Sequence, residues 1–261
     1  MLIDKLAYSS PLRRRSPALK AGLAVGALLI AVAAQSVVVS VVTLLMMGGL
    51  AVGYGRTSFS HYRHLMLVPA AFLVLGAVAI VFQVTTVPLD LWNLPLGGEW
   101  VIGMSRQSLW QGIQLTATAF AAVSCLYFLT LTTPVTDLLN LLRRLHCPAI
   151  LLELMLLIYR YLFVVLEMAQ GMLTAQRCRL GNRNVSTKMR GMGEMLSVLL
   201  VRSLARSSRL YDAMESRLYD GRIQVLSTVQ PAKAWEKAAV LLLLAGLGAL
   251  ALAVGKGGLF G

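Results

Sequence analysis

The stretch from Ala21 to Tyr54 contains 34 consecutive residues without a charged side chain. One helical crossing of a hydrocarbon core roughly 30 Å thick needs about 20 residues. The stretch is long for one crossing, and a tight turn at Gln35 and Ser36 would divide it into two short halves that each reach the far surface. The pattern therefore predicts either one long helix or two short ones.

The composition of the whole chain also indicates a membrane protein. Hydrophobic residues make up 57% of the 261 residues, charged residues make up 13%, and the mean hydropathy is +0.73. An ordinary soluble core would not bury so much apolar surface. Three further apolar spans are predicted, at residues 65–87, 108–132 and 238–254. We expect an all-α integral membrane protein.

Basic residues decide how the chain is oriented, because short cytoplasmic loops of membrane proteins are enriched in Lys and Arg. If residues 21–54 cross twice, three basic groups all lie inside: Arg13 to Lys20, Arg56 with Arg63, and Arg143 with Arg144. The loop 88–105, which has two acidic residues and no basic one, then lies outside. A single crossing would place one basic group outside. We therefore predict about five membrane-spanning helices in a bacterial inner membrane, with a cytoplasmic N-terminus.

The segment 134–231 differs from the rest, because it carries 12 Arg and one Lys. Its apolar stretch 150–166 is interrupted by Glu153 and Arg160, which predicts an amphipathic helix along or under the membrane instead of a span. Thr133-Pro134 and Cys147-Pro148 predict helix boundaries. We divide the chain into an N-terminal membrane part (1–133), a cytoplasmic helical module (134–231) and a C-terminal span (232–261).

Two parts of this module share a pattern. The segments 175–181 and 213–221 both contain Ala-x-x-small-Arg-Leu followed by Gly, 38 positions apart, at the ends of predicted helices. A solvated Arg at a helix C-terminus is favoured by the helix dipole by about 0.3–1 kcal/mol, which would explain either copy alone. The alternative is docking, since a guanidinium can bind a carboxylate in a partner's groove with two hydrogen bonds.

These motifs and their order resemble the transmembrane T component of energy-coupling factor (ECF) transporters. The N-terminal run 3–13, with Pro17 and Lys20, and the segment 209–217 resemble the cobalt-type family, CbiQ. The resemblance implies long crossed coupling helices and two ABC-type ATPase subunits (CbiO-like) that receive Arg179 and Arg217. It also implies a substrate-binding S component (CbiM-like), with or without a small CbiN-like subunit. The implied import is of cobalt, with nickel, biotin or another micronutrient as alternatives.

The docking residues that the resemblance implies surround the two arginines. Cys178 and Ser216 stand where the family has Ala, and Leu180 and Leu218 stand where it has Gly or Ser. The remaining candidates are Ala175, Gly181, Ala213 and Glu215.

Other functions find little support in the sequence. No G-x-x-x-x-G-K-[ST] motif occurs, so we do not expect the chain to hydrolyse ATP, and we expect no cofactor. His61 and His64 lack further ligands nearby, so no metal site is predicted. Few aromatic residues accompany the basic segment, which argues against nucleic-acid binding.

A basic stripe remains open to two interpretations. Arg202, Arg206 and Arg209 share one helix face. They fit membrane lipid headgroups, at about 1 kcal/mol per charge, as well as a protein partner. A membrane-anchored scaffold that grips lipid is therefore the alternative to a transporter subunit.

Overall fold

The computed structural model describes residues 8, 10–55, 57–85, 92–97, 100–179, 184–221, 223 and 233–256. The chain forms two compact units. The first comprises Met1–Leu138 and Thr228–Gly261, and the second comprises Leu139–Ser227.

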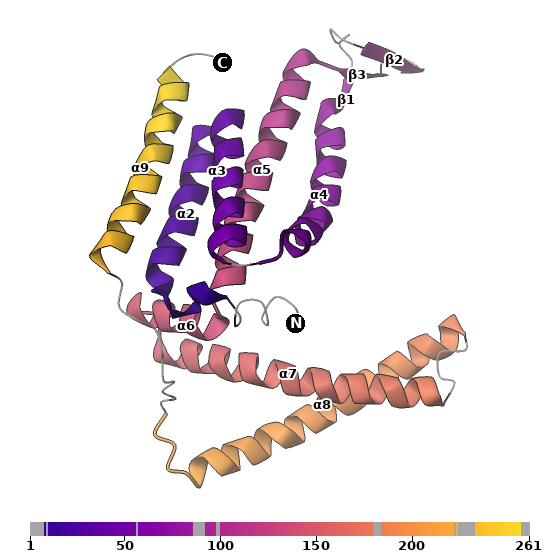
Figure 1. Ribbon diagram of the computed structural model, residues 1–261. Coiled ribbons are helices and arrows are strands. Elements are labelled where there is room, and N and C mark those ends of the chain that lie inside the picture. Colours follow the sequence, from indigo (N-terminus) through magenta and orange to yellow (C-terminus); the bar gives the residue numbers. More distant parts are fainter. Residues whose placement is uncertain are drawn as a thin grey trace. The chain divides into compact units, whose positions relative to one another are not determined.

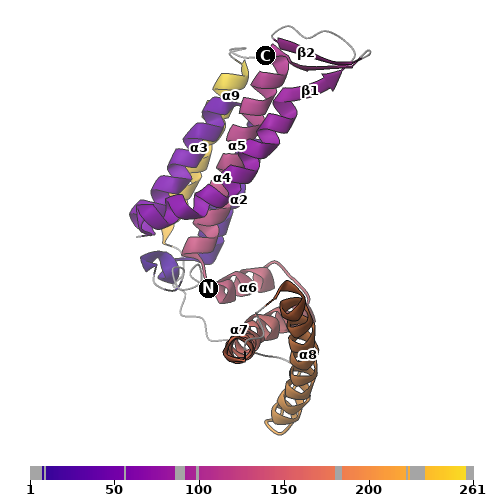
Figure 2. The ribbon, with the colours of Figure 1, turned by 90° about the vertical axis from the view of Figure 1, so that its right-hand side faces the viewer.

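The first unit is a bundle of long helices (Figures 1 and 2). A short 3-10 turn, η1 (Pro11–Arg14), precedes the helices, and α3 continues into the π-helical turn η2 (Leu50–Tyr54). The helices are α2 (Pro17–Ala34), α3 (Val37–Gly49), α4 (Phe59–Val81), α5 (Arg106–Thr132) and α9 (Ala234–Lys256). Helix α5 packs against α2, α3 and α4, and α9 packs against α2.

The uncharged stretch 21–54 forms two helices, which is one of the two predicted alternatives. Gln35 ends α2 in the left-handed conformation, with φ of 42°, and α3 begins at Val37. The backbone carbonyl of Gln35 accepts a hydrogen bond from the side-chain amide of Gln114 on α5. A polar group at the turn thus has a partner within the bundle.

The core of the bundle combines small residues with a few large ones. Gly26 lies where α2 meets α9, and a Cβ there would lie 2.9 Å from Cδ2 of Leu244. Small residues let helix backbones approach closely, which is how helices associate in membranes. Buried core residues include Leu23, Ala24, Ala27, Met47, Ala51, Cys125, Phe128, Leu131 and Leu247.

A small antiparallel sheet lies between α4 and α5, where the sequence analysis expected only a loop. It contains β1 (Phe82–Thr85), β2 (Trp92–Gly97) and β3 (Trp100–Met104), in the order β1-β3-β2. The predicted span 65–87 consequently ends at Val81. Pro95 lies in the edge strand β2, where a missing N–H is tolerated. Asp90 and Glu99 lie outside the described residues.

The second unit contains the long helices α7 (Ala149–Cys178) and α8 (Val185–Glu215), which pack against each other. Helix α6 (Val135–Arg144) leads into it across the boundary between the units. The predicted breaks at Pro134 and Pro148 are confirmed. Helix α8 ends at Glu215, two residues before Arg217.

Six helices, and not five, are long and apolar enough to cross a membrane within the described part of the chain. The sixth is α7, whose first half was predicted to be interfacial because it contains Glu153 and Arg160. Length and mean hydropathy do not separate α7 from the five expected spans. The all-α membrane class is confirmed, and the interfacial location of α7 stays a prediction.

A buried lysine joins three parts of the first unit. Lys20, at the start of α2, is only 6% exposed. Its Nζ donates hydrogen bonds to the carbonyl of Thr132 at the end of α5 (2.8 Å) and to that of Leu12 in η1 (3.0 Å). A cation near a helix C-terminus also interacts favourably with the helix dipole. Nearby, Arg15 forms a salt bridge with Glu236, which holds the start of α9 at the same end of the bundle.

We expect Lys20→Met to lower the free energy of unfolding by about 3 kcal/mol, because two buried carbonyls lose a charged donor. Thermal unfolding of the purified chain in detergent, followed by tryptophan fluorescence, measures this loss. Lys237→Met, which removes an exposed lysine of α9, is the matched control and should change little. Equal stability of the two variants would contradict the structural role of Lys20.

Candidate functional site

The first arginine motif ends α7. The helix stops at Cys178, and the backbone N–H of Arg179 donates to the carbonyls of Ala175 and Gln176, both at 3.2 Å. The side chains of Ala175, Cys178 and Arg179 are exposed. The following Leu180 and Gly181 lie outside the described residues, so their part in docking stays a prediction.

The second arginine motif ends α8 in a well-defined turn. The N–H of Tyr219 donates to the carbonyl of Met214 (3.1 Å), and the N–H of Leu218 donates to that of Glu215 (2.9 Å). This pair of hydrogen bonds defines a Schellman motif, which usually has Gly at its left-handed position. Here that position is Leu218, with φ of 58° and a side chain that is 90% exposed. The turn therefore presents Arg217 and Leu218 together at the end of the helix.

Small polar contacts reinforce the second turn. The Ser216 hydroxyl donates to the carbonyl of Ala213 (3.1 Å), one turn earlier in α8. Ala213, Glu215, Ser216 and Arg217 are all exposed. Within the described residues, neither Arg217 nor Arg179 forms a salt bridge with a carboxylate. Both guanidinium groups are thus available to a carboxylate of another molecule.

A buried carboxylate holds the second turn against α7. Glu153, which is 9% exposed, accepts a hydrogen bond from the Tyr219 hydroxyl at Oε2 (2.7 Å) and one from the backbone N–H of Ile223 at Oε1 (3.3 Å). Arg143 donates to the carbonyl of Ile223 (3.3 Å). We call Glu153, Tyr219 and Ile223 the clamp. The hydrogen bond to Glu153, together with a smaller effect of desolvation, raises the pKa of Tyr219, so its hydroxyl keeps its proton.

The clamp also defines where the two arginines lie. It connects the end of α8 to the start of α7, so the two helices run in opposite directions, and Figure 1 shows them crossing. Arg179 follows the far end of α7, 26 residues beyond Glu153, which corresponds to roughly 40 Å of helix. Arg217 and Arg179 therefore lie at opposite ends of the helix pair.

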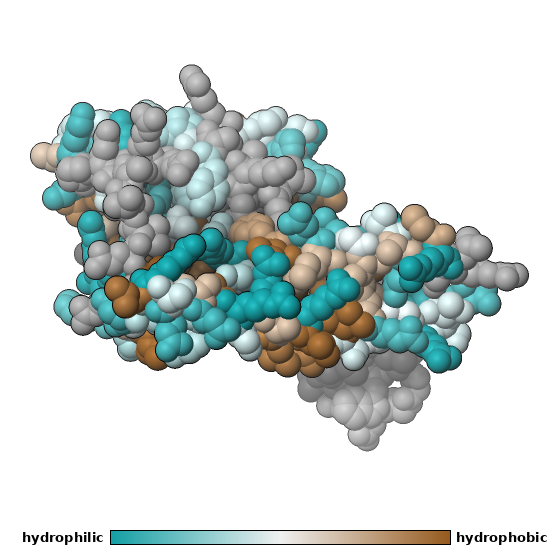
Figure 3. All heavy atoms as spheres, turned by 90° about the horizontal axis from the view of Figure 1, so that it is seen from below, coloured by the Kyte–Doolittle hydropathy of each residue, from teal (hydrophilic) through white to brown (hydrophobic). Residues whose placement is uncertain are grey.

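The surface of this pair is both basic and apolar. Arg202, Arg206 and Arg209 are all exposed on α8. The same helix exposes large apolar side chains, among them Leu200, Val201 and Leu204. Figure 3 shows hydrophilic and hydrophobic side chains adjoining each other on one face of the molecule. The stripe therefore stays compatible with both lipid and a protein partner.

The structure assembles no metal centre from its described residues. No group of three or more His, Cys, Asp or Glu side chains lies close enough to hold an ion. His61 and His64 are exposed on the first turns of α4. Cys125, Cys147 and Cys178 are free thiols.

The positions of both arginine motifs at helix ends were predicted from the sequence, and the clamp was not. Glu153 was noted only as a charge that interrupts an apolar stretch. A single carboxylate in such a stretch is a signal for a buried polar contact, but nothing in the sequence names Tyr219, 66 positions away, as its partner.

Comparisons with known proteins give a consistent result. A family model described as "Cobalt transport protein" (CbiQ) matches residues 8–227. An uncharacterized protein of Methanocaldococcus jannaschii is 31% identical over 229 residues, covering 88% of this chain and 84% of that protein. The cobalt transport protein CbiQ of Rhodobacter capsulatus is 33% identical over 232 residues, covering 87% of each chain.

A third relative combines two names in one chain. The putative fused cobalt transport protein CbiMQ of Methanocorpusculum labreanum is 29% identical over 220 residues, covering 84% of this chain and 37% of that protein. The family match extends from α2 through α8, including both arginine motifs, and ends before α9. The chain therefore belongs to the CbiQ family of cobalt transport proteins.

Proposed function

We propose that this chain is the membrane coupling subunit of an ATP-driven cobalt importer of the ECF type. Two CbiO-like ABC-type ATPase subunits bind at Arg179 and Arg217 and hydrolyse the ATP, and a CbiM-like S component carries the substrate. The observation that carries the proposal is the pair of exposed arginine motifs at opposite ends of two packed helices.

The geometry suits docking of two separate subunits. A guanidinium binds a carboxylate through two parallel hydrogen bonds, which fixes orientation as well as position. Each arginine lies just beyond a helix of about 30 residues, which is a stiff element roughly 45 Å long. When ATP draws the two ATPase subunits together, displacement of either arginine motif moves the whole helix that precedes it. The helix pair can thus pass this motion to the membrane part and to the S component.

The comparisons support cobalt as the transported ion and a CbiM-like protein as one partner. The family description and the Rhodobacter capsulatus relative favour cobalt over nickel, biotin or another micronutrient. The fused CbiMQ relative favours a CbiM-like S component, since its name joins the two proteins in one chain. The Rhodobacter capsulatus and Methanocorpusculum labreanum relatives are named as transport proteins, which agrees with a non-catalytic subunit.

The orientation follows from the basic residues. The contacts of Lys20 and Arg15 bring the start of α2, the end of α5 and the start of α9 to one end of the bundle. This is the arrangement that a cytoplasmic N-terminus requires under the positive-inside rule. We propose an inner-membrane location with that end in the cytoplasm.

We expect Arg179→Ala and Arg217→Ala each to weaken binding of the ATPase subunits by about 10- to 100-fold, the contribution of a hydrogen-bonded charge. The double variant should lose both binding and cobalt uptake. Pull-down of the purified ATPase subunits and uptake in cells measure these effects, with membrane levels of the chain matched. Arg→Lys should not rescue either site, because an ammonium group lacks the planar fork.

Arg190→Ala is the control for this experiment, because Arg190 is an exposed arginine of α8 that pairs with Glu194 four residues on. It should bind the ATPase subunits normally. Retained binding and uptake in the Arg179 and Arg217 double variant would overturn the docking proposal and favour a scaffold that grips lipid.

The clamp should affect only the second docking point. We expect Tyr219→Phe to weaken ATPase binding several-fold, because the turn that carries Arg217 loses its hydrogen bond to Glu153. Tyr211→Phe, which changes a tyrosine of α8 that is 64% exposed, is the matched control. Combined with Arg179→Ala, Tyr219→Phe should weaken binding further, whereas combined with Arg217→Ala it should add nothing. If Tyr219→Phe instead weakened binding further only in combination with Arg217→Ala, the clamp would act on the Arg179 site.

A further inference from the structure

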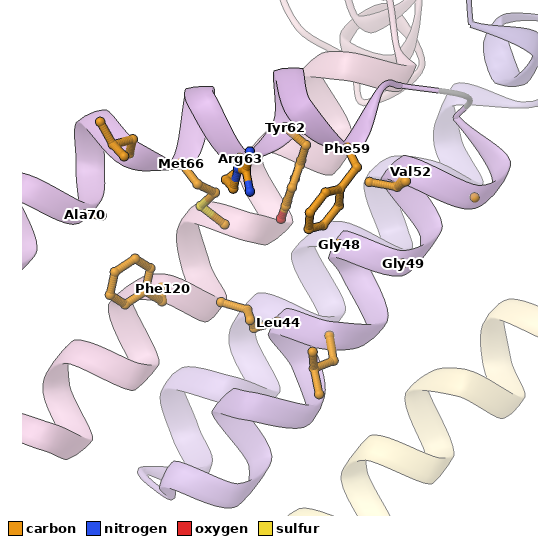
Figure 4. A pocket seen from close by; sticks show the side chains of 13 residues that line it. Leu44, Gly48, Gly49, Val52, Phe59, Tyr62, Arg63, Met66, Ala70 and Phe120 are labelled. Carbon is orange, nitrogen blue, oxygen red and sulfur yellow. The ribbon is translucent and has the colours of Figure 1, made fainter.

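An open groove runs along the first unit between α3, α4 and α5. Its volume is about 780 Å³, and almost all of its lining is apolar. Figure 4 shows the side chains of Leu44, Met66 and Phe120, one from each helix, around the same space. The proposed function gives this groove no role.

The groove is formed without any ligand. The Tyr62 hydroxyl hydrogen-bonds to the Ser124 hydroxyl (2.9 Å), and the Tyr127 hydroxyl donates to the carbonyl of Leu65 (3.1 Å). Both contacts hold α4 against α5, and Tyr62 is buried. A binding site that is already formed does not lose free energy to ordering when its ligand arrives.

Two glycines of α3 and its π-helical turn keep the groove open. A Cβ built on Gly49 or Gly53 would meet no atom within 4 Å, and both residues are exposed. Larger side chains at these positions would therefore fill the groove and leave the protein's own contacts unchanged. Gly48 differs, because a Cβ there would lie 3.2 Å from the Tyr62 hydroxyl.

Among the described residues that line the groove, one is a cation, Arg63, toward the Phe59 end. Arg63, near the start of α4, is exposed, and its guanidinium lies 5.9 Å from the centre of the Phe59 ring. No salt bridge joins it to a carboxylate in the described ranges. The groove thus has a positive end beside the beginning of a spanning helix and an apolar interior.

The length of the groove distinguishes between possible occupants. Its walls extend from Gly53 to Leu44 on α3 and from Phe59 to Ala70 on α4, which corresponds to roughly 14–16 Å of helix. One leaflet of the hydrocarbon core is about 15 Å thick, whereas a spanning helix of another subunit would need a seam of about 30 Å. The dimensions and the charge fit one lipid acyl chain below an anionic headgroup.

We propose that this groove binds one anionic phospholipid, with its phosphate at Arg63 and an acyl chain along Gly53 and Gly49 toward Phe120. Arg63 supplies the charge that distinguishes an anionic headgroup from a zwitterionic one. The glycines supply the space for the chain, and the π-helical turn places Gly53 beside the headgroup end.

The test uses the purified full chain in phosphatidylcholine nanodiscs with phosphatidylglycerol that carries a photoreactive acyl chain. We expect labelling of α3, α4 and α5 side chains in the groove, and unlabelled phosphatidylglycerol should compete better than phosphatidylcholine. Gly49→Leu should abolish this labelling. Arg63→Ala should reduce the preference for phosphatidylglycerol by about five-fold, the factor for one basic residue near an anionic surface, and Arg63→Lys should restore it.

Gly76→Leu is the matched control, because Gly76 lies on α4 outside the groove and also has open space around it. It should label like the wild type, and equal thermal unfolding of the two Leu variants verifies that both are folded. Labelling that survives Gly49→Leu, or equal competition by phosphatidylcholine, would overturn the proposal in favour of general contact with the bilayer. Protein cross-links from another subunit to the groove of the assembled complex would overturn it in favour of a partner helix.

Discussion

An unsatisfied backbone polar group in hydrocarbon costs several kcal/mol, and this constraint governs the first unit. Regular helices satisfy most of these groups internally, so the critical points are the ends. At these ends, the Gln114 side chain donates a hydrogen bond to the carbonyl of Gln35, and Lys20 donates one to the carbonyl of Thr132. Within the bundle, the buried Thr43 hydroxyl likewise donates to the carbonyl of Val39.

In the second unit, the end of α8 is exposed and yet has a well-defined backbone turn. A non-glycine residue in the left-handed conformation costs about 1–2 kcal/mol. Leu218 adopts this conformation in the second arginine motif, where its side chain is almost fully exposed. The hydrogen bonds that Glu153 accepts from Tyr219 and Ile223 fix the chain directly after this turn. Contacts remote in sequence thus offset local strain and keep Arg217 in place.

The same distinction between local and remote contacts explains what could be predicted. The turn at Gln35, the breaks at Pro134 and Pro148, and the placing of both arginines at helix ends depend on local chemistry. Glu153 could not be matched to Tyr219, and Lys20 could not be matched to Thr132, because both pairs depend on how helices pack. The small sheet was missed because prolines and glycines near Trp92 and Trp100 resemble a loop.

Arginine has several roles in this chain, and its surroundings distinguish them. Beside Glu194, Arg190 is an ordinary exposed ion pair on one helix face. Beyond the ends of α7 and α8, Arg179 and Arg217 are exposed and follow carbonyl-rich helix ends, which suits the carboxylate on another protein that we propose. Arg63 instead stands over an aromatic ring at the mouth of an apolar groove, which suits a headgroup with a chain attached. A large positive charge therefore does not imply one kind of partner, because each guanidinium selects its partner through the shape of the surface next to it.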